Sequence, residues 1–206
     1  TTNYVIPLRI TSFENLDTLL VGEKIENVAN PIRIRDEDWR ITPKDYTLFG
    51  IKFINKYDGI YLRRGADVMT NSAGEVTTSE YRAEFIVQDE LVTLTTSTRS
   101  NVTLFNRVRR GETLISPGNV NLGLSFDEND NCTVESSDDV YNVTGTGRFV
   151  QDGDEWGGKK QDVIYLDYSY TDVANNENHS VKDTLVIRNR DIKFEEFTLN
   201  FEKSGN

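Results

Sequence analysis

Apolar and polar residues alternate along most of the chain, and this period of two residues constrains the fold more than any other feature. Side chains of a β-strand point to opposite faces in turn, so these runs predict half-buried strands. No long segment has the period of about 3.6 residues that marks an amphipathic helix. We predict strands at residues 4–10, 47–54, 59–68, 81–87, 91–97, 101–108, 121–126, 141–150, 162–170, 180–189 and 192–201.

Turn-forming residues separate the predicted strands, at 71–75, 116–119, 127–131 and 173–178. Asn, Gly, Pro and Asp favour turns because they tolerate or preset the required backbone angles. Short strands at regular spacing predict an all-β fold, and we expect an antiparallel meander that closes into a barrel. A two-sheet β-sandwich is the alternative. Pro7 lies inside the first run and therefore marks an edge strand.

The chain divides by pattern into an arm and a barrel-like domain. Residues 1–45 read as an N-terminal arm or linker, with Trp39 as its anchor, and residues 46–206 read as the β domain. Within that domain, residues 51–94 and 147–197 form a weak internal repeat, in which short motifs such as Ile-Tyr-Leu recur in the same order. The second copy is longer, and its additional residues surround Trp156.

The net charge and the small number of cysteine and histidine residues argue against several classes of function. The net charge of −11 disfavours proteins that follow the nucleic-acid backbone, and it also disfavours binding to anionic membrane surfaces. One cysteine and one histidine leave little for metal sites or nucleophilic triads. We therefore predict no cofactor, no metal site, no nucleic-acid partner and no enzyme activity. No stretch approaches the ~20 apolar residues of a membrane-spanning helix.

Trp156 stands in a polar, glycine-rich loop, and two interpretations stay open. It either caps an open end of the sheet or contacts a ligand, because Trp has both a large apolar ring and a hydrogen-bond donor. In the second case, Tyr57 from the equivalent loop of the other repeat should share the rim, together with Asp152, Asp154 and Lys159.

Arg63 and Arg64, next to Tyr61, form a second candidate site. Paired arginines grip carboxylates or sugar hydroxyls, but they also occur at strand ends with one arginine in an ion pair. His179 lies in a predicted exposed turn and reads as solvated, and Cys132 reads as a half-buried strand thiol. The acidic run at 127–130 reads as a hairpin turn, since it lacks the spacing of a calcium loop.

The motifs IKFINKYDGIYLRRGAD (51–67) and GDEWGGKKQDVIYLDY (153–168) resemble those of uncharacterised secreted lipoproteins of gut Bacteroidetes, a family of adhesin type. The resemblance covers most of the chain. It implies a lipocalin- or calycin-like β domain, with residues 4–10 as the last strand of a preceding sandwich-like domain, so that the arm is a remnant of that domain.

The same resemblance implies a location on the outside of the cell or of the outer membrane, with membrane attachment only through a lipid anchor outside this chain. It further implies a non-catalytic glycan-binding or adhesin-like module. A structural module within a surface complex and a barrel that holds a small apolar ligand are the alternatives.

Overall fold

The computed structural model describes residues 3–15, 17–136, 141–190 and 192, and it is all-β, as the alternation predicts. The described residues divide into two compact units, one before Ile54 and one from Ile54 onward. Within these ranges the helical segments are two short 3-10 turns, η1 (Asp36–Asp38) and η2 (Ile86–Gln88). None of the described helices is long and apolar enough to cross a membrane.

The N-terminal unit is built on a two-stranded antiparallel ribbon. β1 (Asn3–Arg9) pairs with β4 (Tyr46–Lys52) along its whole length. A smaller ladder joins β2 (Glu23–Lys24) to β3 (Trp39–Ile41). The predicted arm therefore contains regular structure, and it takes up the strand at 46–52 that we had assigned to the barrel domain. This strand belongs with the arm because its partner is β1.

Buried groups hold the N-terminal unit together. The carboxylate of Asp45 is fully buried and binds Arg33 and the Nε of Arg9, the latter at 3.1 Å. The indole of Trp39 donates to the carbonyl of Ile32 at 2.9 Å. Its ring lies so close to Gly22 that a Cβ there would be 2.8 Å from the ring, which explains why this position has no side chain. Trp39 thus anchors the chain within its own unit.

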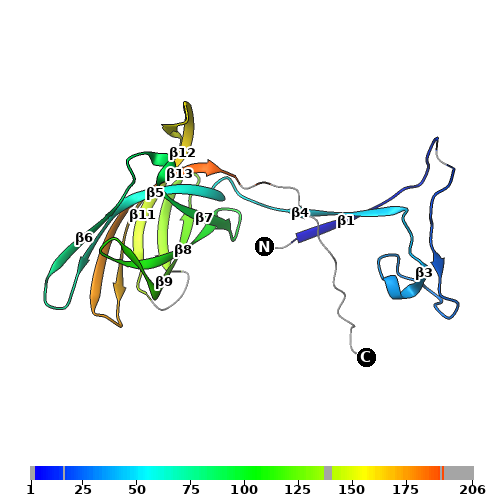
Figure 1. The fold of residues 1–206 in the computed structure, drawn as a ribbon, viewed down its shortest axis with the longest axis horizontal. Helices are drawn as coiled ribbons and strands as arrows, with labels where there is room; N and C mark the ends of the chain where they lie inside the picture. Colours follow the sequence, from blue (N-terminus) through cyan, green and yellow to red (C-terminus); the bar gives the residue numbers. More distant parts are fainter. Residues whose placement is uncertain (1–2, 16, 137–140, 191, 193–206) are drawn as a thin grey trace. The chain divides into compact units, whose positions relative to one another are not determined.

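The second unit is a closed antiparallel barrel of eight strands (Figure 1). Successive strands pair from β7 to β13, and β13 then pairs with β5, so the sheet closes on itself as we predicted. Closure pairs most of the strand edges that an open sheet would expose to another chain. The strands are β5 (Gly59–Thr70), β7 (Glu90–Thr96), β8 (Asn101–Arg110), β9 (Thr113–Phe126), β10 (Asn131–Ser136), β11 (Thr144–Trp156), β12 (Lys159–Asp172) and β13 (Glu177–Asn189).

Two strands share one edge of β5. β7 pairs with the first residues of β5, and β6 (Val76–Tyr81) pairs with its last residues. The chain leaves β6 through a loop that contains η2 and then re-enters the barrel wall. The strand predicted at 81–87 is therefore wrong. The turn at 71–75 forms as expected. The residues that follow it, 76–81, form the strand next to β5 in place of 81–87.

The ladder between β7 and β8 is short. It covers Leu94–Thr96 on one strand and Val102–Leu104 on the other. Beyond it, Glu90–Thr93 stay paired with β5, while the rest of β8 stays paired with β9. The wall of the barrel consequently parts between β7 and β8.

Inward-facing side chains fill the barrel in two regions. Around one end they are apolar and fully or nearly buried, among them Tyr57, Tyr61, Leu94, Leu104, Leu122, Leu124, Phe126, Phe149, Ile164 and Leu185. Toward the other end the same strands carry buried polar and charged side chains, among them Arg63, Asp67, Asn106, Asp172, His179 and Asp183. We call these regions the apolar half and the polar half.

The internal repeat does not correspond to equivalent positions in the barrel. Tyr61 of the first Ile-Tyr-Leu motif is fully buried, whereas Tyr165 of the second is only half buried and lies under the guanidinium of Arg148. Residues 148–150 lie in β11, but the matched residues 52–54 end the β1–β4 ribbon and lead out of it. The strand predicted at 192–201 lies outside the described residues except for its first position.

Candidate functional site

The hairpin of β11 and β12 carries most of the predicted rim residues. Trp156 is half buried, and its indole Nε1 donates to the carbonyl of Ile187 on β13 at 3.0 Å. Asp152, Asp154 and Lys159 are exposed around it. The contact between Trp156 and β13 favours the capping interpretation, because the donor of the indole is already satisfied by the barrel.

Tyr57 faces inward instead of toward solvent. It is 5% exposed, stacks on Phe126 with ring centroids 3.7 Å apart, and meets the edge of Phe149 at 5.3 Å. Its hydroxyl donates to Asp130 at 2.7 Å, and burial together with this carboxylate raises the pKa of the phenol. Tyr57 therefore closes the apolar half, and its ring has no free face for a ligand.

The two arginines at 63 and 64 point to opposite faces of β5. Arg64 binds the buried carboxylate of Asp89 at 2.5 Å, and Asp89 also accepts from the backbone amide of Ala83 at 2.8 Å. This contact fixes the loop after β6 to the barrel wall. Arg63 points into the polar half, where it is 3% exposed.

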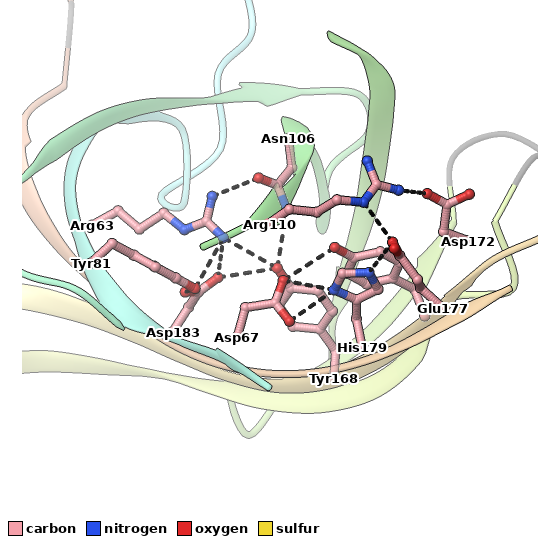
Figure 2. A network of polar contacts seen from close by, with 11 residues as sticks. Arg63, Asp67, Tyr81, Asn106, Arg110, Tyr168, Asp172, Glu177, His179 and Asp183 are labelled. Atoms are coloured by element: carbon pink, nitrogen blue, oxygen red, sulfur yellow. Dashed lines mark hydrogen bonds and ion pairs between the residues drawn. The ribbon is translucent and has the colours of Figure 1, made fainter. Parts of the chain in front are cut away.

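Arg63 is the centre of a buried network (Figure 2). Its Nη1 donates to the side-chain oxygen of Asn106 at 2.6 Å, and its Nη2 donates to Asp183 at 2.7 Å. Tyr168 joins both partners, since its hydroxyl donates to Asp183 at 3.2 Å and accepts from Asn106 at 3.1 Å. Burial opposes the charge of Arg63, but Asp183, Tyr168 and Tyr81 together outweigh it and hold the pKa well above its usual value.

Gly65 makes room for a further member of this network. A Cβ at this position would lie 2.2 Å from the carbonyl oxygen of Lys182 and 2.5 Å from the carboxylate of Asp183. Tyr81 of β6 fills the space, and its hydroxyl donates to Asp183. Burial and the nearby carboxylate raise the pKa of Tyr81 and Tyr168, so both phenols stay neutral donors at ordinary pH.

A second buried cluster lies farther along the same strands. The Nδ1 of His179 is 2.9 Å from Asp67, which also accepts from the hydroxyl of Tyr170 at 3.2 Å. The ring of Tyr170 stacks on His179 with centroids 4.3 Å apart. The prediction that His179 is solvated is wrong, because β13 begins at Glu177 and the alternation of the strand then turns His179 inward.

Arg110 completes the polar half. Its Nε donates to Glu177 at 2.7 Å and its Nη2 to Asp172 at 2.6 Å. Burial opposes the charge of Arg110, but the two carboxylates raise its pKa. The interior of this half thus has every arginine opposite a carboxylate.

An open cleft of about 370 Å³ reaches this network where β7 and β8 part. It is lined by Glu90–Thr93, Phe105–Arg107, Arg63 and Leu114. Phe105 is 55% exposed, and the guanidinium of Arg107 lies 5.7 Å from the centre of its ring. Glu90 binds the Nη2 of Arg109 at 2.9 Å. The buried Nε of Arg63 has no hydrogen-bond partner, which is costly unless another group supplies one.

Two further groups that the sequence singled out are a cysteine and an acidic turn. Cys132 is buried, and burial raises the pKa of its thiol to about 12, so it is not a thiolate at ordinary pH. The turn at 127–130 forms the predicted hairpin between β9 and β10, with Asp127 accepting from the amides of Asn129 and Asn131. In the described part of the chain, no three acidic, histidine or cysteine side chains are grouped to hold a metal.

Residues 56–191 match the model of a family described as Domain of unknown function (DUF5627). The chain belongs to the DUF5627 family. The match covers the barrel and leaves out the β1–β4 ribbon. No curated protein matches the sequence.

Two solved structures are similar to this DUF5627 protein. A protein of unknown function from Bacteroides ovatus, solved at 2.40 Å resolution, is 34% identical, with a TM-score of 0.75, over 92% of this chain and 59% of its own. An auxiliary nutrient binding protein from Bacteroides thetaiotaomicron VPI-5482 is 14% identical, with a TM-score of 0.37, over 89% of this chain and 56% of its own. The chain therefore spans less than two thirds of either protein. The family of unknown function and the Bacteroides ovatus structure agree with the resemblance to an uncharacterised Bacteroidetes family.

Sequence reasoning singled out Arg63 but missed the residues that surround it in the DUF5627 cleft. Phe105 and Arg107 sit at outward positions of a strand whose inward positions are Leu104 and Asn106. A large apolar residue on the polar face of an alternating strand was the available signal. The other wall of the cleft, β7, could not be predicted in this way. The gap between β7 and β8 depends on how far the two strands pair, and the sequence does not show where that pairing ends.

Proposed function

We propose that the barrel is a non-catalytic carbohydrate-binding module and that the cleft between β7 and β8 is its site. One observation carries the proposal. Arg63 is buried and has an unpartnered Nε, and it lines an open cleft whose rim is an exposed phenylalanine. Buried polar groups are nearly always satisfied, so an unsatisfied one on a residue that lines a cleft marks a place where a polar ligand can supply the missing partner after a small shift of the side chain.

The lining suits a sugar ring. Sugars have an apolar face of C–H groups that can pack on an aromatic ring, and Phe105 offers such a ring next to Leu91, which is 51% exposed. Hydroxyl groups of a sugar need donors and acceptors, which Asn106, Glu90 and Arg63 supply. The volume of about 370 Å³ is within the range of small-molecule sites.

The buried network gives these groups fixed positions. Asn106 is held by Arg63 on one side and by Tyr168 on the other, at 2.6 and 3.1 Å. Side chains that are already ordered lose little conformational entropy when a ligand binds, which favours affinity. This is a role that a solvent-exposed arginine and asparagine could not fill as well.

The resemblance to secreted Bacteroidetes lipoproteins supplies the setting. We propose that the module works at the cell surface, attached through a lipid anchor outside this chain, as a glycan-binding or adhesin-like part of a longer protein. A barrel that encloses a small apolar ligand is a weaker candidate. Tyr57, Phe126 and Phe149 pack on one another and fill the apolar half, which leaves little space for such a ligand.

A glycan array probed with the intact chain tests the proposal. We expect the wild type to bind at least one glycan class and Phe105→Ala to lose most of that signal. Tyr165→Ala is the matched control, because Tyr165 is a partly exposed aromatic on β12, across the barrel from the cleft. An empty array, or a Phe105→Ala signal equal to that of the wild type, would contradict the proposed site.

A further inference from the structure

The charges around the cleft are unevenly matched. Glu90 is the carboxylate in the lining, and Arg109 already binds it at 2.9 Å. Arg63 is neutralised from behind by Asp183. Arg107 is exposed at the rim, and no carboxylate lies within ion-pair distance of it in the described ranges. Arg107 is therefore an arginine at the cleft that forms no ion pair with any described residue.

The position of Arg107 directs that charge toward a ligand on Phe105. Its guanidinium centre is 5.7 Å from the centroid of the Phe105 ring, close enough for a cation–π contact. A sugar ring packed on Phe105 would place its substituents beside this guanidinium. The five N–H donors of arginine form a planar fork that matches the two oxygens of a carboxylate.

We infer that the cleft selects acidic sugars, in which the ring carries a carboxylate, and that Arg107 is the group that makes the selection. This inference rests on the proposed carbohydrate-binding function and specifies its ligand class. Dense polyanions are poor candidates because the chain has a net charge of −11, which repels them at long range. A single carboxylate on an otherwise neutral ring meets the local arginine with much less of that penalty.

Isothermal titration with two matched probes tests the inference. The probes are the methyl glycoside of galacturonic acid, a single ring with one carboxylate, and the same compound with its carboxyl group converted to a methyl ester. We expect the acid to bind the intact chain about tenfold more tightly than the ester, the scale of one charge-assisted hydrogen bond. Arg107→Gln should weaken the binding of the acid far more than the binding of the ester, so that most of this preference disappears.

Arg148→Gln is the matched control for Arg107→Gln. Arg148 is exposed and lies over an aromatic ring, that of Tyr165, at 5.4 Å, but it does so on β11 and β12, away from the cleft. It should keep the full preference for the acid. Circular dichroism of both variants checks that the barrel is intact.

The outcomes separate this inference from the function on which it rests. If the acid and the ester bind equally and Phe105→Ala weakens both, the cleft is a carbohydrate site but selectivity for acids is overturned. A monosaccharide with one sulfate group that binds more tightly than the galacturonate would also overturn selectivity for carboxylates. If neither probe binds and the glycan array is empty as well, the function itself fails.

Discussion

The apolar and polar halves of the barrel are built from the same strands, yet they differ in the kind of side chain that each buries. β5 passes from Tyr61 in the apolar half to Arg63 and Asp67 in the polar half, and β13 passes from Leu185 to Asp183 and His179. The apolar half packs aromatic and aliphatic side chains without buried charge. The polar half removes arginines and carboxylates from water, which is expensive even when they are paired.

The gap between β7 and β8 lies in the polar half. The β7–β8 ladder holds at the level of Leu94 and Leu104, which belong to the apolar half, and it stops before Asn106 in the polar half. Well-packed hydrophobic residues in place of a buried ion pair are often as stable or more stable. The comparison indicates that the apolar half maintains the barrel and that the polar half serves the cleft.

The largest effect is expected from Asp183→Asn. This change keeps the shape of the side chain but removes the charge that pairs with the buried Arg63 at 2.7 Å and leaves Glu90, at 4.0 Å, as the nearest carboxylate. It also replaces one of the two oxygens that accept from Tyr81 and Tyr168 with an NH2 donor. Breaking a buried ion pair in this way costs about 3–5 kcal/mol of the free energy of unfolding. Urea denaturation of the barrel would measure it.

Asp167→Asn is the control for that substitution. Asp167 pairs with Lys182 on the neighbouring strand at 2.6 Å, but its side chain is 58% exposed. An exposed ion pair contributes about 0–1 kcal/mol. Equal losses in the two variants would remove the distinction between buried and exposed pairs on which the comparison depends.

A somewhat smaller effect is expected from Leu122→Ala in the apolar half. Leu122 is fully buried, and truncation of such a residue costs about 2–5 kcal/mol because a cavity remains. We expect lower stability with unchanged ligand affinity, as measured by denaturation and titration. Leu91→Ala should do the reverse, since Leu91 is exposed at the cleft. A strong loss of ligand affinity in Leu122→Ala at a temperature where it stays folded would count against the division of roles.

Alkaline pH should act through the buried tyrosines, three of which lie in the polar half, while Tyr57 and Tyr61 of the apolar half share the effect. Burial and nearby carboxylates raise the pKa of Tyr81, Tyr168 and Tyr170 above the value of about 10 in unfolded chains. Below about pH 10 both states keep these protons, so the stabilisation is fully present. Above about pH 10 the unfolded state loses protons that the folded state retains, so stability falls as the pH rises.

The Tyr168→Phe variant isolates this contribution. It should be less stable than the wild type at neutral pH, because Asn106 and Asp183 lose a hydrogen-bond partner. Its melting temperature should then fall less steeply above about pH 10, since one of the responsible phenols is absent. Parallel slopes of the two curves would show that Tyr168 does not contribute to the alkaline loss.

The smallest effect is expected from Trp156→Phe at the hairpin. The change keeps an aromatic ring and removes the hydrogen bond to the carbonyl of Ile187. One such bond contributes about 0.5–1.5 kcal/mol, which a thermal melt can detect. Glycan binding should not change. A loss of binding with unchanged stability would move the binding site from the cleft to this hairpin.

The alternating sequence predicted most of the fold because each strand of a closed barrel has one buried face. It predicted β12 and β13 well, since more buried and more exposed residues alternate over most of each strand, at 165–172 and at 178–185. It assigned the strand at 46–52 to the wrong unit, because strand pairing is a long-range property that alternation does not encode. It missed β6, whose residues Val76–Glu80 are mostly polar and exposed.

The site was harder to predict for a related reason. Arg63 could be chosen from its local motif, but its partners Asn106 and Asp183 are 43 and 120 residues away along the chain. Tyr57 and His179 were predicted to be accessible because their neighbours are polar. Both are buried, since the barrel brings distant side chains over them.

The central claim is that ligands bind where the polar half opens between β7 and β8. An NMR titration of the isotope-labelled intact chain with the best ligand from the array tests it most directly. The account predicts amide shifts concentrated at Glu90–Thr93 and Phe105–Arg107, with little change around Tyr57 and Trp156. Shifts concentrated at the apolar end or at the β11–β12 hairpin, with none at the cleft, would contradict it.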